Sequence, residues 1–142
     1  MGRLLGIDFG QVRIGLAISD ERQKIALPLG MVRAGRTLPE TAEAIRAKMA
    51  SYLPVDKIII GLPLELSGKE GTMAQKVRAF AQALEALLLI PFIFWDERLT
   101  SAQVERSLKD RGMKRKQRAE HSDELAAMTI LQNYLDAHGW QS

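Results

Sequence analysis

Residues 3–19, RLLGIDFGQVRIGLAIS, decide the fold of this 142-residue chain. Residues 3–9 form a short apolar run bounded by glycine, which predicts a strand. Residues 13–19 alternate loosely between apolar and other residues and predict a second strand. Only residues 10–12 connect the two runs, which indicates an antiparallel hairpin. One acid, Asp8, interrupts the first run.

The rest of the chain alternates between strand and helix signals. Strands are expected at residues 25–32, 57–61 and 91–95, the first of them at a sheet edge because Pro28 cannot donate a backbone hydrogen bond there. Helices are expected at residues 37–52, 72–89, 100–109 and 122–137. The first three open on a threonine followed three residues later by Glu or Gln, the pattern of a capping box.

This order predicts a single α/β domain over residues 1–142. Three early strands on short connections should form an antiparallel meander, and the later strands, which follow helices, should pair in parallel. We therefore expect a mixed five-stranded sheet flanked by helices. In such sheets, functional sites collect at the carboxyl ends of the parallel strands.

The composition is that of a globular protein without special covalent chemistry. The chain has no cysteine, so disulfides, thiolate metal sites and cysteine nucleophiles are excluded. No apolar stretch reaches the roughly 20 residues that a membrane span needs, and the N-terminus does not resemble a signal peptide. These features predict a cytoplasmic protein with no membrane partner.

The positive charge is concentrated in one segment. The net charge is +3, but residues 109–118, KDRGMKRKQR, alone carry six basic residues and one acid. A local patch of this kind suits a polyanion such as nucleic acid. The alternative is a solvated loop without a partner, and the segment by itself does not separate the two.

Asp8 has two interpretations. Burying an unpaired carboxylate inside an apolar strand is costly, so a cation, an arginine or several hydrogen-bond donors should lie beside it. Gly6 and Gly10 flank Asp8 and leave the backbone open to a ligand. The alternative is a structural aspartate that turns the first hairpin by bonding to its own backbone.

Two further segments carry acids that are candidates for the same site. Asp96 and Glu97 follow the strand expected at 91–95 and should point to opposite sides, so one of them should face Asp8. The alternative for this segment is a local ion-paired turn. Asp123 lies at the start of the last helix, where an acid can also serve only to complement the helix dipole.

If these carboxylates converge, they need a cation to offset their mutual repulsion. With only oxygen ligands available, the natural ions are Mg²⁺ or Mn²⁺, and two such ions can clamp a phosphodiester during hydrolysis. His121 and His138 are too few and too scattered for a zinc site. His121, two residues before Asp123, is a further candidate for proton transfer.

Four segments together resemble the YqgF family, the Holliday-junction-resolvase-like proteins that are also described as pre-16S ribosomal RNA nucleases. The segments are GIDFGQVRIGLAISD (6–20), GLPLELSGKEG (61–71), DERLTS (96–101) and HSDELAAMTILQNYL (121–135). The resemblance implies a ribonuclease H-like fold and an acidic triad of Asp8, Glu97 and Asp123, and it is the main reason to prefer Glu97 over Asp96.

The same resemblance implies the substrate and its contacts. Arg13, Gly61, Pro63 and Gly68 fall on positions that the family is expected to turn toward nucleic acid. The local charge of the basic segment, rather than the resemblance, adds Lys114, Arg115, Lys116 and Arg118 as candidate contacts. The implied function is metal-dependent cleavage of structured RNA in 5′-end maturation of pre-16S rRNA, by a monomer or weak homodimer. The alternatives are a resolvase acting on DNA junctions and a non-catalytic RNA-binding factor in ribosome assembly.

An ATPase or sugar kinase of the actin-like group is the competing interpretation from another class. Such proteins also open on an Asp-x-Gly strand pair that grips phosphate. They enclose a nucleotide between two such domains, whereas this sequence contains one and has no second phosphate loop.

Overall fold

The computed structural model describes residues 2–99 and 122–138. The strands are β1 (Arg3–Asp8), β2 (Arg13–Ser19), β3 (Ala26–Arg33), β4 (Val55–Leu62) and β5 (Phe92–Asp96). The helices are α1 (Leu38–Met49), α2 (Thr72–Leu88) and α5 (Ser122–His138), with short 3-10 turns η1 (Ala50–Tyr52) and η2 (Glu97–Leu99). Among these described helices, none is long and apolar enough to cross a membrane.

The strands form one mixed sheet in the order β3-β2-β1-β4-β5. β1 pairs antiparallel with β2 and β2 with β3, whereas β1–β4 and β4–β5 are parallel. This confirms the expected meander followed by parallel strands, and it confirms that the strand with Pro28 lies at an edge. The helix expected at residues 100–109 lies outside the described residues.

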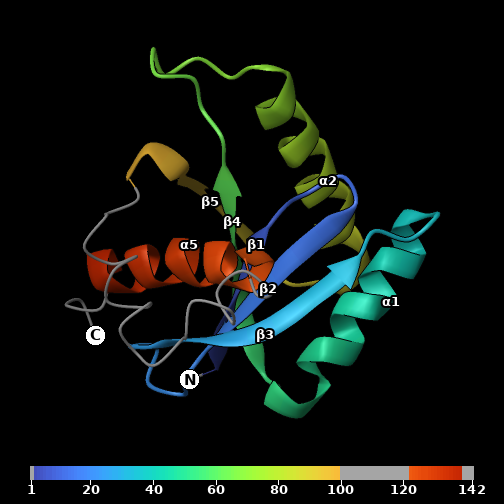
Figure 1. Cartoon of the computed structure of the whole chain (residues 1–142). Helices are drawn as coiled ribbons and strands as arrows, with labels where there is room; N and C mark the ends of the chain where they lie inside the picture. Colours follow the sequence, from blue (N-terminus) through green and yellow to red (C-terminus); the bar gives the residue numbers. More distant parts are fainter. Residues whose placement is uncertain (1, 100–121, 139–142) are drawn as a thin grey trace.

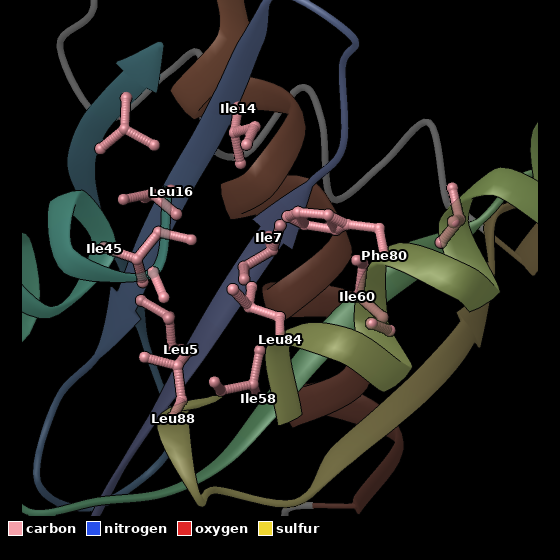
Figure 2. Close-up of a cluster of buried hydrophobic side chains, with 14 of the residues drawn as sticks. Leu5, Ile7, Ile14, Leu16, Ile45, Ile58, Ile60, Phe80, Leu84 and Leu88 are labelled. Atoms are coloured by element: carbon pink, nitrogen blue, oxygen red, sulfur yellow. The ribbon is translucent and has the colours of Figure 1, made fainter. Parts of the chain in front are cut away.

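One face of the sheet packs on α1 and α2, which lie together on one side in Figure 1. Alternate strand residues point to this side because successive side chains of a strand face opposite ways. Leu5 and Ile7 of β1, with Ile58 and Ile60 of β4, are fully buried against Leu84 of α2 and its neighbours. Figure 2 shows these side chains meeting between the sheet and α2.

Among the described helices, α5 is the one that packs on the other face, which carries a glycine on each of three strands. Gly6 of β1, Gly15 of β2 and Gly61 of β4 lie on three adjacent strands beneath this helix. A Cβ on Gly6 would lie 2.8 Å from Leu131 Cβ, and a Cβ on Gly15 would collide with the backbone oxygen of Asp123. The absence of side chains at these positions therefore lets α5 lie directly on the sheet.

The N-termini of the helices show that one of the expected capping boxes is absent. At α1, the Thr37 hydroxyl accepts from the Glu40 amide at 3.3 Å, as the capping pattern predicts, while Glu40 accepts from the amide of Arg36. At α2, the capping box on Thr72 is wrong: Thr72 is already the first helical residue, and Gly71 precedes it without a side-chain cap. The Gln75 amide donates to the Gly71 carbonyl, which is the first backbone hydrogen bond of the helix itself.

The glycine-lined face generates a stability prediction. Gly15→Ala should lower the free energy of unfolding by about 1–3 kcal/mol, the usual cost of overpacking a tight contact, because the clash is with backbone rather than with a movable side chain. Urea denaturation of both proteins measures the difference.

Gly71→Ala is the matched control. Its added Cβ meets mainly the end of the flexible Glu65 side chain, at 3.1 Å. We expect a loss below about 1 kcal/mol, the scale of an altered helix cap. An equal loss at both positions would contradict the close approach of α5 as the cause.

Candidate active site

Asp8 is the last residue of β1 and faces α5. Leu4 and Gly6, on the same side of the strand, also contact that helix. Asp8 is paired across the sheet with Gly15, so no neighbouring side chain on β2 covers its carboxyl group. Burial, together with the nearby charges of Glu97 and Asp123, raises the pKa of Asp8 to about 7.

Glu97 follows directly on β5 and lies on the same side of the sheet. Its carboxylate contacts the backbone of β4 at Gly61, where a Cβ would collide with it. Burial raises the pKa of Glu97, and the charge of Asp96 adds to the effect. Gly61 thus makes room for an acid on the neighbouring strand, which explains a glycine in an otherwise β-branched strand.

Asp96 points away from this site, as the alternation along the strand predicts. It accepts hydrogen bonds from Arg98, with Arg98 Nη2 at 2.7 Å from Asp96 Oδ2, and these bonds hold the pKa of Asp96 below its ordinary value. Arg98 Nη1 also lies 3.4 Å from the carbonyl oxygen of Leu66 in the loop after β4. Both interpretations of the segment are therefore right in part: Asp96 and Arg98 form a local ion pair, and Glu97 faces Asp8.

Asp123 stands in the first turn of α5, directly above β2. Its backbone touches Gly15, the residue opposite Asp8, which brings the start of the helix to the end of β1. Arg13 Nε lies 3.5 Å from Asp123 Oδ2, with the arginine side chain 57% exposed and the aspartate 30%. Asp123 thus has a charged partner in addition to its place at the helix start.

The three carboxylates converge at the edge of the sheet where β1, β4 and β5 end. They come from three elements that are far apart in the sequence. In the described part of the chain, Asp8 and Glu97 have no basic partner, and Asp123 has only Arg13. Hard divalent cations prefer such oxygen donors, so the donor chemistry fits Mg²⁺ or Mn²⁺. As the side chains stand, no group of three acids or histidines within residues 2–99 and 122–138 forms a ready ligand set for one ion.

The remaining candidates divide into two groups. Gly68 lies in the loop between β4 and α2, at φ +90°, a conformation that favours glycine, and it packs beneath the Arg98 guanidinium. In Figure 1 this loop extends past the end of β4 toward the start of α2. Lys114, Arg115, Lys116, Arg118 and His121 lie outside the described residues.

Sequence reasoning missed two features of the site. One is the contact of Arg98 with the loop after β4, which ties Leu66 and Gly68 to the strand end that carries Glu97. The other is the role of Gly15 and Gly61 in making space for the acids. Glycines within apolar strands are the signal that was available for the second, since they commonly mark a close approach of another segment.

A mixed sheet in this order, with acids gathered at its carboxyl edge beneath one helix, defines the ribonuclease H-like class of α/β proteins. The fold is similar to Thermus thermophilus RuvC in complex with Holliday junction substrate, with a TM-score of 0.61 at 16% identity, covering 100% of this chain and 98% of that one. It is also similar to the fowlpox virus resolvase in complex with Holliday junction DNA (TM-score 0.57, 12% identity, 95% and 97% coverage).

The chain belongs to the RuvX family, described as Holliday junction resolvase, which it matches over residues 2–137. A relative from Protochlamydia amoebophila is 44% identical over 140 residues, which cover 95% of this chain and 93% of the relative's own length. A relative from Methylocella silvestris is 43% identical over 134 residues, which cover 94% of this chain and 82% of the relative. Both carry the name "Putative pre-16S rRNA nuclease". The resemblance inferred from the four sequence segments is confirmed.

The raised pKa of Asp8 generates a pH-dependent prediction. The unfolded chain ionises Asp8 near pH 3.8, whereas the folded protein keeps it protonated up to about pH 7. Stability is therefore lost as the pH rises between these values. Without metal, Asp8→Asn should stabilise the protein, and the gain should be about 2–3 kcal/mol larger at pH 8 than at pH 5, at 1.36 kcal/mol per pKa unit.

Urea denaturation in EDTA at the two pH values measures this gain. Asp96→Asn is the control, because the pKa of Asp96 is lowered by Arg98 and its replacement should give no gain at pH 8. A gain from Asp8→Asn that does not change with pH would show that Asp8 is ionised across the whole range.

Proposed function

We propose that this protein is a metal-dependent nuclease that hydrolyses phosphodiester bonds in structured RNA, in 5′-end maturation of pre-16S rRNA. The observation that carries the proposal is the convergence of Asp8, Glu97 and Asp123 on a half-buried position that lacks a matching cation among the described residues. A site with this excess of negative charge is suited to divalent metal and, through the metal, to a phosphate. The names of the relatives support pre-16S rRNA as the substrate.

In this proposal the three carboxylates would hold two Mg²⁺ or Mn²⁺ ions. Such ions, when bound, lower the pKa of a coordinated water and stabilise the charge that develops on a phosphoryl group. Asp8 is the central residue of the three, because its pKa responds to both of the others. α5 positions Asp123 over β2, and Gly61 leaves space for the Glu97 carboxylate, so the fold itself fixes the ligands relative to one another.

Arg13 would hold the phosphate backbone next to the metal site. Its guanidinium lies beside Asp123 and is more than half exposed, so it can reach a ligand that approaches from solvent. Arginine forms bidentate hydrogen bonds with phosphate oxygens. Gly68 and the basic residues Lys114, Arg115, Lys116 and Arg118 remain proposed contacts further along the substrate.

Cleavage of DNA junctions is the second candidate function. The description of the family and the fold shared with two solved resolvases favour it. The proposed catalytic residues are the same for both substrates, so the site alone does not separate them. A monomer or weak homodimer, as the sequence leads us to propose, suits single cuts in RNA better than paired cuts in a four-way junction.

A cleavage assay tests the function directly. Purified protein should cut a precursor of the small-subunit rRNA in the presence of Mg²⁺ or Mn²⁺ but not in EDTA. Asp8→Asn and Glu97→Gln should each lower the rate at least 100-fold, because each removes a ligand charge from the metal site. Gel analysis of labelled RNA and of a four-way DNA junction, run in parallel, separates the two substrates.

Asp96→Asn is the matched control for Glu97→Gln. It changes the adjacent acid, which points to the other side of the strand, and should keep activity within a few-fold of the original. Full activity in Asp8→Asn would refute the proposed site. Binding of the RNA without cleavage under every metal condition would favour the non-catalytic assembly factor.

Metal binding is testable without any substrate. Mg²⁺ or Mn²⁺ at about ten times its Kd should raise the free energy of unfolding by about 1.4 kcal/mol, because the ion binds the folded protein only. We expect a rise of a few degrees in Tm for the unmodified protein and none for Asp8→Asn. A rise of equal size in both would place the ion elsewhere.

A further inference from the structure

A cavity of about 390 Å³ lies behind the acidic site, on the opposite face of the sheet. Its walls come from the β1–β2 connection, the residues after β3, the start of α1 and the middle of α2. Figure 1 shows the β1–β2 connection beside α2 at this end of the sheet. None of the functions assigned above uses this cavity.

The floor of the cavity is aromatic and its rim is polar. Phe9 and Phe80 pack with ring centroids 4.7 Å apart and an interplanar angle of 44°. Gln11, Arg36 and Thr37 line the cavity from exposed positions. No acid is among its lining residues in the part of the chain that the structure describes. This combination suits a flat aromatic ligand that carries hydrogen-bonding groups on its edge and a negative charge nearby.

The cavity is one residue away from the proposed catalytic position. Phe9 follows Asp8 directly, and consecutive Cα atoms are about 3.8 Å apart. Because side chains alternate at the end of β1, Asp8 faces α5 and Phe9 faces α2. A strand whose phosphate lies at Asp8 would therefore have a neighbouring base within reach of Phe9, around the end of the sheet.

We propose that this cavity binds an unpaired nucleobase of the substrate, next to the bond that is cut. The inference rests on the proposed nuclease function and extends it from the phosphate to the base. The base would lie on the aromatic floor, as unstacked bases lie on aromatic side chains in other RNA-binding proteins. The Gln11 amide would contact the edge of the base, and Arg36 the adjoining phosphate. The preferred substrate therefore has an unpaired or easily unpaired nucleotide beside the scissile bond.

Two variants on α2 test the cavity. Ala79 is an exposed lining residue, so Ala79→Trp fills the cavity without disturbing the core. Ala86→Trp adds the same side chain two turns further along α2, at an exposed position outside the cavity. Binding is measured in EDTA, by fluorescence anisotropy, with a short single-stranded RNA and with versions that carry one abasic nucleotide at each position in turn.

We expect one abasic position to weaken binding by the unmodified protein about ten-fold, the scale of one lost stacking contact. Ala79→Trp should bind the intact RNA about ten-fold more weakly and lose nothing further at that abasic position, whereas Ala86→Trp should behave like the unmodified protein. Gln11→Ala should change which base is preferred at that position.

Equal RNA binding by Ala79→Trp and Ala86→Trp would overturn the proposal. It would also be overturned if the abasic nucleotide weakened binding by Ala79→Trp as much as it weakens binding by the unmodified protein. The cleavage assay keeps this result separate from the nuclease proposal. Cleavage with no dependence on the cavity would leave the nuclease and remove the base site. RNA binding that depends on the cavity, without cleavage, would support the base site and refute the nuclease.

Discussion

The close contact between α5 and the glycine-lined face of the sheet is the constraint on which the rest of the structure depends. Gly6, Gly15 and Gly61 lie on three adjacent strands, and α5 crosses all three. Larger residues there would lift the helix and carry Asp123 away from the end of β1. The position of the candidate site is therefore a product of packing on one face of the sheet, although the chemistry proposed for it belongs to three acids.

The electrostatics of the site follow from that packing. Asp8 is held in a position where burial and two neighbouring carboxylates oppose its ionisation, and Arg13 offsets only part of the charge. Such an arrangement costs stability in the free protein, and it persists because the apolar contacts on both faces of the sheet hold the strands in place. In the proposed function, the destabilising charge and the binding of a cation would have the same origin.

The strands and the direction of their pairing could be predicted from the sequence, because the patterns that indicate them are local. The hairpin in residues 3–19, the edge strand with Pro28 and the β-branched run of β4 each depend on neighbouring residues. The direction of Glu97 followed from the two-residue period of β5, with the family resemblance deciding between it and Asp96. The glycines signal that some segment comes close, but which segment meets each of them, and the cavity at Phe9, could not be predicted, because both depend on which distant segments meet. Thr72 shows the limit of local patterns, since the capping motif is present and the cap is not.

The alternation of Asp96 and Glu97 has a consequence for how this protein can change over time. The two acids differ in role only because one faces α5 and the other faces Arg98. Insertion or deletion of a single residue within β5 would exchange their sides and place an arginine-bound carboxylate where the free one now stands. The number of residues in β5 is therefore as constrained as the identity of Glu97 itself.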